Sequence, residues 1–194
     1  LNKLFLEVII ANGFESSAIK ILKAKKNLRL IDGTNYTSRE LFKFVSFNQN
    51  IMIQSEDLNL FSTKNFKIVS KRKPTSKQLK DLIFAFNVCR YVKSNAIVLA
   101  SNETTVGIGS GQPSRLDSCQ IAINKMKKFN LQNDNLVAAS DAFFPFVDGI
   151  EKLVQSGVRA VVQPSGSIRD KEIINFANET DTVLLFSKTR HFRH

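Results

Sequence analysis

The sequence predicts an α/β fold, and three observations lead to that prediction. Short apolar runs of strand length alternate with segments of helical periodicity, turn residues separate the two, and 43% of the 194 residues are hydrophobic. Such alternation is typical of helices packed on a β-sheet. The hydrophobic fraction is typical of a globular chain rather than a disordered one.

The amino-terminal region predicts a strand, a helix and a second strand. The apolar run 4–11 ends at a turn, residues 15–24 place apolar side chains at helical spacing, and residues 28–31 form another short apolar run. This order is typical of an α/β layer. Residues 34–70 are less regular, and short antiparallel strands are predicted there by five residues: Phe42, Phe44, Phe47, Ile51 and Ile53.

A stronger pattern begins at about residue 71, where we place a domain boundary. Thr75 and Gln78 have the spacing of a capping box, which predicts a helix that runs to about Tyr91. The expected elements that follow are strands 96–101 and 104–108 as a hairpin, helix 115–128, strand 136–139, helix 146–156, strand 158–163, a helix from 168 or 170 to 180, and strand 182–186.

The positive charge is concentrated in the first half of the chain. The net charge is +11, and residues 1–100 hold 17 of the 28 basic residues but only 7 of the 17 acidic ones. We interpret the densest run, residues 71–80, as a solvated surface, because no aromatic residues interleave with its lysines as a stacking platform requires. A basic RNA-binding module is the alternative. A positive field would also attract small anionic substrates.

The two cysteines, Cys89 and Cys119, indicate neither a disulfide framework nor a metal site. They form no C-x-x-C pair, and there is no H-x-E motif, so we expect buried thiols in a cytoplasmic protein and no zinc. No apolar stretch approaches the roughly 20 residues that span a bilayer, so we expect no membrane contact. An apolar strand close to a first residue that is not Met suggests a piece of a longer protein.

A glycine-rich loop precedes the helix expected at Arg115. Glycines at 107, 109 and 111 match neither a dinucleotide-binding fingerprint nor a P-loop. Glycines after a strand let a ligand approach the backbone, and the following helix offers free N–H groups to an anion. Because Arg115 opposes the helix dipole, it is expected to hold either an anionic ligand or a structural ion-pair partner.

Three further segments follow expected strands. Residues 140–148 contain Phe143, Phe144 and Phe146, which suit either core packing or a wall for a flat aromatic ligand. With such a ligand, the Asp148 carboxylate would accept hydrogen bonds from the N–H donors of the ring edge. Residues 163–168 offer hydroxyls and backbone amides as a polar cradle. The tail 190–194 contains both histidines, with a disordered or tag-like tail as the alternative.

Five segments in the same order resemble the AICAR (aminoimidazole carboxamide ribotide) transformylase/IMP cyclohydrolase family. They are residues 93–98, 107–115, 139–146, 163–170 and 190–194. The resemblance implies a cytidine-deaminase-like three-layer α/β/α fold with a mixed sheet and without zinc. Residues 1–70 would be the end of a first transformylase subdomain with a connecting segment, and residues 71–194 the second subdomain.

The resemblance also implies a reaction in purine biosynthesis. The family transfers a formyl group from 10-formyltetrahydrofolate to the 5-amine of AICAR, and a separate amino-terminal domain closes the product to IMP. Its active sites lie at a homodimer interface and draw on both chains. The resemblance leaves room for a monovalent cation and makes a nucleic-acid partner the less favoured alternative.

The family's functional residues carry over onto matching positions. Asn95 matches the asparagine at the AICAR carboxamide and reacting amine, and Arg115 and Arg190 match AICAR-binding arginines. His194 matches a terminal histidine near the site. The folate-binding positions are matched by Leu116, Phe143, Asp148, Ser167 and Ile168.

Two departures from the family pattern stand out. Val147 occupies a position where the family commonly has Arg, so the charge near the folate differs. No Lys-His dipeptide occurs in the chain, although the family uses such a pair as proton acceptor and transition-state stabiliser. We therefore expect a carboxyl-terminal part of the transformylase region, without the cyclohydrolase domain or a catalytic residue of its own, and inactive alone.

Overall fold

The computed structural model describes residues 4–36, 42–128 and 135–194, and the chain divides into two compact units at residues 56 and 57. This division lies before the boundary that the sequence predicts at 70/71. The reason is that Phe61 and the short strand β5 (Phe66–Ile68) pack into the core of the second unit.

The first unit contains the strand, helix and strand expected from the sequence. Strands β1 (Val8–Ala11) and β2 (Arg29–Asp32) pair in parallel on either side of helix α1 (Ser16–Leu22) in the chain. Strands β3 (Phe42–Phe47) and β4 (Asn50–Ser55) form the expected antiparallel hairpin. None of the candidate site residues belongs to this unit.

The second unit contains a six-stranded mixed sheet in the order β5-β10-β9-β8-β6-β7. Strands β8, β9 and β10 are parallel to one another, whereas β5 and β6 run in the opposite direction and β7 pairs antiparallel with β6. The bounds are β6 Ile97–Ser101, β7 Thr104–Gly109, β8 Val137–Ser140, β9 Ala160–Pro164 and β10 Val183–Ser187. The predicted α/β class and mixed sheet are confirmed.

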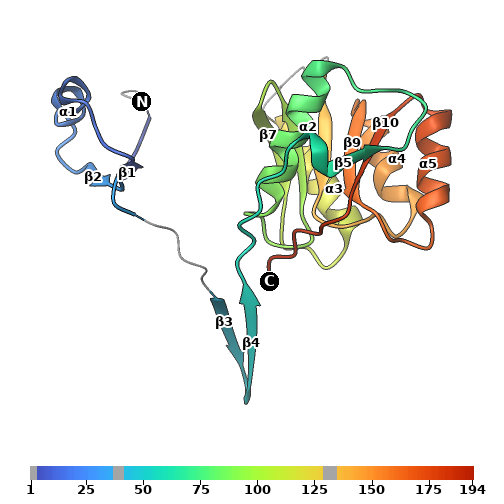
Figure 1. The fold of residues 1–194 in the computed structure, drawn as a ribbon, viewed down its shortest axis with the longest axis horizontal. Coiled ribbons are helices and arrows are strands. Elements are labelled where there is room, and N and C mark those ends of the chain that lie inside the picture. Colours follow the sequence, from blue (N-terminus) through green and yellow to red (C-terminus); the bar gives the residue numbers. More distant parts are fainter. Residues whose placement is uncertain (1–3, 37–41, 129–134) are drawn as a thin grey trace. The chain divides into compact units, whose positions relative to one another are not determined.

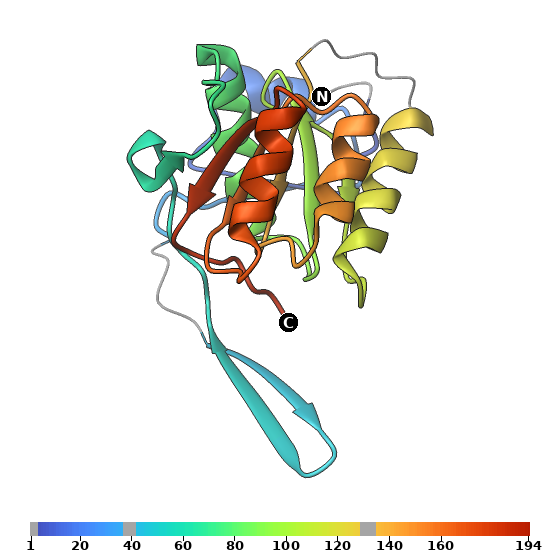
Figure 2. The ribbon, with the colours of Figure 1, turned by 90° about the vertical axis from the view of Figure 1, so that its right-hand side faces the viewer.

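Helices cover both faces of this sheet and make three layers (Figure 1). Helix α2 (Ser76–Cys89) packs on one face, against β6 and β8. Helices α3 (Arg115–Lys128), α4 (Val147–Gln155) and α5 (Asp170–Glu179) lie side by side on the other face, as Figure 2 shows. The expected α/β/α layering is therefore confirmed.

Alternation along the strands produces two hydrophobic cores. Ile97 and Leu99 of β6 point into the core beneath α3, α4 and α5, whereas Val98 and Ala100 point into the core beneath α2. The same alternation holds along β8, β9 and β10, because successive side chains of a strand face opposite sides of the sheet. Strands buried on both faces read as continuous apolar runs, which is why the sequence predicted them well.

Helix α2 begins with the capping box that the sequence predicts. The Gln78 backbone N–H donates to Thr75 Oγ1 at 3.1 Å, and the Thr75 N–H donates to Gln78 Oε1 at 3.0 Å. One turn later, buried Asp81 accepts the backbone N–H groups of Asn102 and Glu103. The helix is thereby tied to the tight turn between β6 and β7.

Two of the three glycines before α3 have a role other than the predicted one. A Cβ on Gly107 would lie 2.2 Å from the carbonyl oxygen of Ala122, and a Cβ on Gly109 would lie 1.9 Å from that of Ser118. Both glycines belong to β7, and they allow α3 to pack directly on the strand. The interpretation that they open the backbone to a ligand is therefore wrong for these two positions.

Candidate functional site

The candidate residues gather at one edge of the sheet because of strand direction. Strands β7, β8, β9 and β10 all end at the edge where the antiparallel strand β6 begins. The segment before β6 and the loops after the other four strands therefore meet, although they are far apart in the sequence. Ligand sites in α/β proteins commonly lie at such strand ends.

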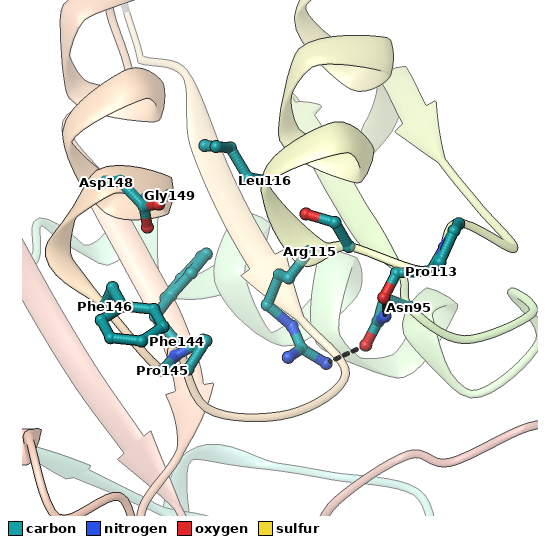
Figure 3. Close-up of a pocket in the computed structure, with 10 residues that line it drawn as sticks. Asn95, Pro113, Arg115, Leu116, Phe144, Pro145, Phe146, Asp148 and Gly149 are labelled. Carbon is teal, nitrogen blue, oxygen red and sulfur yellow. Dashed lines mark hydrogen bonds between the residues drawn. The ribbon is translucent and has the colours of Figure 1, made fainter.

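A pocket of about 420 Å³ lies at this edge (Figure 3). Four of the predicted site residues line it: Asn95, Arg115, Leu116 and Asp148. Figure 3 shows Asp148 and Phe146, from the α4 side, across the pocket from Arg115 and Asn95. The other lining residues are Pro113, Ser114, Phe144, Pro145, Phe146 and Gly149. Its volume is within the range of small-molecule sites.

Arg115 is engaged by groups of the protein itself. Its guanidinium donates to Asp141 Oδ1 at 2.9 Å, to Asn95 Oδ1 at 2.8 Å and to the Phe143 carbonyl oxygen at 3.1 Å. The side chains of Arg115 and Asp141 are only 10% and 0% exposed. Of the two predicted roles, the structural ion pair is the one present in the structure. No pattern in the sequence indicated Asp141 as its partner.

Asn95 is held in one orientation by the same network. Its side-chain N–H groups donate to the carbonyl oxygens of Gln112 at 2.9 Å and Pro113 at 3.1 Å, while its Oδ1 accepts from Arg115. The Ser118 hydroxyl also donates to the Asn95 backbone carbonyl at 2.7 Å. A ligand that hydrogen-bonds to this amide must therefore share or replace an existing partner.

The phenylalanines of the loop after β8 divide between the two predicted roles. Phe144 is buried core, and its ring fills the space that a side chain on Gly149 would need. Phe146 is 52% exposed at the pocket and lies under the guanidinium of Arg169, with 4.7 Å between guanidinium carbon and ring centre. Both packing and an exposed aromatic wall are present.

Asp148 lies in the first turn of α4 and exposes its carboxylate to the pocket. Its Oδ1 accepts the Gly149 backbone N–H at 2.7 Å, and a carboxylate in a first turn is favourable for the helix dipole. The preceding Val147 is partly buried against the core and brings no charge to the pocket.

The remaining predicted residues lie outside the pocket lining. Arg190 stacks over the ring of Phe143, with 4.8 Å between guanidinium carbon and ring centre, and adjoins Gly166. Ser167 is half-buried, and its N–H donates to Asp170 Oδ1. Ile168 is fully exposed, and His194 is exposed with its ring 5.6 Å from that of Phe192. The structure thus brings Arg190 to Phe143, whereas neither Ile168 nor His194 lines the pocket.

The carboxyl-terminal tail packs on the domain, so the alternative of a disordered or tag-like tail is wrong. His191 is 1% exposed, its Nδ1 contacts Asp57 Oδ2, and its ring centre lies 4.9 Å from that of Phe61 and 4.3 Å from that of Phe86. Its backbone N–H donates to the Asp141 carbonyl oxygen at 2.9 Å. This anchor fixes the chain next to Arg190, which stacks on Phe143, and no pattern in the sequence indicated it.

The two cysteines are buried thiols, as predicted. Burial raises the pKa of Cys89 well above its usual value and that of Cys119 to about 12. Neither is therefore a nucleophile at neutral pH. Across the described residues, no group of three or more His, Cys, Asp or Glu is placed to hold a metal ion, and no helix has the length and apolar character to cross a membrane.

Comparisons with known proteins point to one family. The family model described as AICARFT/IMPCHase bienzyme matches residues 1–125. A bifunctional purine biosynthesis protein PurH of Buchnera aphidicola subsp. Schizaphis graminum (strain Sg) is 46% identical over 194 residues, which is 99% of this chain. The protein of the same description from Persephonella marina (strain DSM 14350 / EX-H1) is 43% identical over 196 residues and covers the whole chain.

The chain spans only 37% and 38% of the lengths of these two curated relatives. Among solved structures, that of an apo dCMP deaminase from the cyanophage S-TIM5 aligns with 58% of this chain and 98% of its own, with a TM-score of 0.39 and 15% sequence identity.

Proposed function

The chain belongs to the AICARFT/IMPCHase bienzyme family, and on this premise we propose that it forms substrate-binding walls of a formyltransferase. The reaction transfers the formyl group of 10-formyltetrahydrofolate to the amine of AICAR in purine biosynthesis. Residues 71–194 would form the second transformylase subdomain. The observation that carries the proposal is the pocket that joins Asn95, Arg115, Leu116 and Asp148.

Asn95 and the two arginines would hold AICAR. Because Asp141 already neutralises Arg115, the exposed guanidinium of Arg190 is better suited to the phosphate. Arg115 would act at shorter range, by fixing the Asn95 amide that faces the carboxamide and amine. The buried His191 holds the chain beside Arg190 in place.

The opposite wall would hold the folate. Leu116 and the exposed ring of Phe146 offer apolar surface to a flat pterin, and the Asp148 carboxylate accepts hydrogen bonds from its ring N–H groups. Phe143 lies under Arg190 and would separate the two substrates. Ser167 and Ile168 lie outside the pocket lining, so they would meet only a more distant part of the folate.

The reaction needs a proton acceptor for the amine as it attacks the formyl carbon. The pocket lining contains one carboxylate, Asp148, and no histidine or lysine. We therefore propose that this chain binds and orients the substrates and that a Lys-His segment of the family pattern supplies the base. A homodimer that shares its active sites, as the resemblance implies, would bring further groups to the same pocket.

Binding to the 194-residue chain tests the proposal. We expect AICAR and a folate analogue to bind in titration calorimetry, and we expect Asn95→Leu to abolish AICAR binding. Gln155→Leu is the matched control, because Gln155 lines a different groove between α3 and α4. Equal AICAR affinities of the two variants would contradict the proposal.

The RNA-binding alternative has less support. Arg72, within the basic run, pairs with Asp181, and Thr75 and Gln78 of the same run serve as the helix cap. These contacts give the run a structural role. Salt-dependent RNA retention stronger than AICAR binding would favour the alternative.

A further inference from the structure

A second pocket, of about 390 Å³, lies at the opposite end of the sheet from β7, beside the edge strand β5. Strand β5 pairs antiparallel with β10 at this edge of the sheet. The residues that line the pocket are Phe61, Lys64, Asn65, Phe66, Lys67, Phe186, Lys188 and Thr189. None of them lines the candidate formyltransferase pocket.

The charge of this lining has one sign. Three lysines, Lys64, Lys67 and Lys188, surround the pocket, and no carboxylate lines it. Among the described residues, none of the three forms an ion pair. The surrounding sequence has the same bias, because residues 58–80 contain seven Lys or Arg and no Asp or Glu. Like charges around one hollow repel each other, and a bound anion would remove that cost.

Three aromatic side chains, Phe61, Phe66 and Phe186, also line the pocket. Lys67 of β5 pairs directly with Phe186 of β10, so the ammonium group and the ring rise from opposed positions of neighbouring strands. Phe66 also lines the pocket, but it packs against the core on the other face of the sheet, with its ring centre 6.0 Å from that of Phe61. The pocket thus combines flat apolar surface with three cations, which is chemistry suited to an anion that carries a ring.

We propose that this lysine pocket binds a small phosphorylated ligand with an aromatic ring, of the class of nucleoside diphosphates. Lys64, Lys67 and Lys188 contact its phosphates, and the ring lies against Phe186, which shares a face of the sheet with Lys67. The site is separate from the one proposed for formyl transfer. Consecutive residues link the two sites, because Thr189 lines the lysine pocket and Arg190, the next residue, stacks on Phe143.

The test uses ADP and inorganic pyrophosphate as probes in titration calorimetry on the 194-residue chain. We expect ADP to bind more tightly than pyrophosphate because only ADP has a ring that can contact Phe186. The triple variant Lys64→Gln, Lys67→Gln, Lys188→Gln should weaken ADP binding at least about tenfold. All three lysines are exposed, so circular dichroism should show an unchanged fold.

A second triple variant, Lys77→Gln, Lys80→Gln, Lys125→Gln, is the matched control. It removes the same charge from exposed positions outside the pocket and should leave ADP affinity unchanged. An equal loss of ADP affinity in both triple variants would overturn the proposal and indicate a general positive field instead. Failure of the unmodified chain to bind ADP at millimolar concentration would also overturn the proposal. Displacement of ADP by saturating AICAR would overturn it by placing the nucleotide in the other pocket. The proposal would also be overturned if an RNA oligonucleotide bound more tightly than ADP and lost affinity equally in both variants. That result would indicate a nucleic-acid-binding surface.

Discussion

Arg115 and Asp141 form an ion pair, 2.9 Å between Nη2 and Oδ1, that is almost completely removed from solvent. The pair joins the first residue of α3 to the loop after β8, and the same guanidinium fixes the amide of Asn95. Removal of one member of a buried pair is far more costly than loss of a surface pair, because it leaves an uncompensated buried charge. One arginine therefore serves both the fold and the candidate site.

Replacement of Arg115 by Ala should weaken AICAR binding and also destabilise the domain. We expect a loss of about 3–5 kcal/mol in the free energy of unfolding, because Asp141 is left unpaired. The double variant Arg115→Ala, Asp141→Asn should recover part of that stability without recovering AICAR affinity. Urea unfolding and titration calorimetry separate the two effects. Unchanged AICAR affinity in the single variant would show that the arginine is only structural.

Replacement of Gly109 by Ala should be severely destabilising, because the new methyl group would overlap the Ser118 carbonyl of α3. Overpacking of this kind typically costs about 1–3 kcal/mol and more where backbone must move. Gly157→Ala is a useful comparison, since nothing lies within 4 Å of its Cβ position and only its φ of +102° opposes the change. In thermal unfolding, the melting temperature of Gly109→Ala should be well below that of Gly157→Ala. The reverse order would contradict the close packing of β7 and α3.

The elements of the second unit were predictable because their strands are buried on both faces and their helices carry clear caps or apolar stripes. The predicted strand 182–186 corresponds to β10, and the Thr75–Gln78 capping box is present. Strand β5 was missed, since three residues that include a lysine have too short a pattern.

The site was harder to predict, because its contacts are tertiary. The spacing of Gly107 and Gly109 indicates close approach but not whether a ligand or a helix approaches. The helical periodicity of residues 115–128 does not distinguish a core position from the pocket-lining position that Leu116 takes. The burial of His191 depends on Asp57, which lies 134 positions away in the sequence. Only the apolar strand immediately before the tail hinted that the tail would pack.

The buried thiols should make stability depend on pH in the alkaline range. The pKa of Cys119 is raised from 9.0 to about 12, so the unfolded chain loses this proton before the folded one. The thiol therefore has no net effect well below pH 9, and it destabilises the fold progressively as pH rises from 9 towards 12, by at most about 1.4 kcal/mol for each pH unit.

Urea unfolding between pH 7 and 10 measures this effect. Cys119→Ala should lower stability at pH 7 but flatten its decline above pH 9. An identical decline in the variant and the unmodified chain would show that the thiol does not contribute.

The chain alone should have negligible formyltransferase turnover. It contains no Lys-His dipeptide, and loss of a general base typically reduces rate about 10²–10⁴-fold. Turnover of AICAR and 10-formyltetrahydrofolate should be measured beside a full-length relative. A rate within tenfold of that relative would mean that a group in this chain, with Asp148 the first candidate, acts as the base.

Replacement of Asp148 by Asn tests the folate wall. The two roles of Asp148, first-turn charge and ligand acceptor, predict different outcomes. Its carboxylate is exposed, and its one hydrogen bond, to the Gly149 N–H, is local, so loss of the charge should reduce helix stability by only about 0.3–1 kcal/mol. A pterin that donates two N–H groups to the carboxylate would lose much more, because a hydrogen bond to a charged group contributes about 1.5–3 kcal/mol, or ten- to a hundredfold in affinity. Binding of a folate analogue should therefore weaken by that factor while the melting temperature changes little.

Glu151→Gln, one turn further along α4 and outside the pocket, removes the same charge and should leave binding unchanged. If Asp148→Asn instead binds the analogue normally and melts several degrees lower, the residue is structural and the pterin must lie elsewhere.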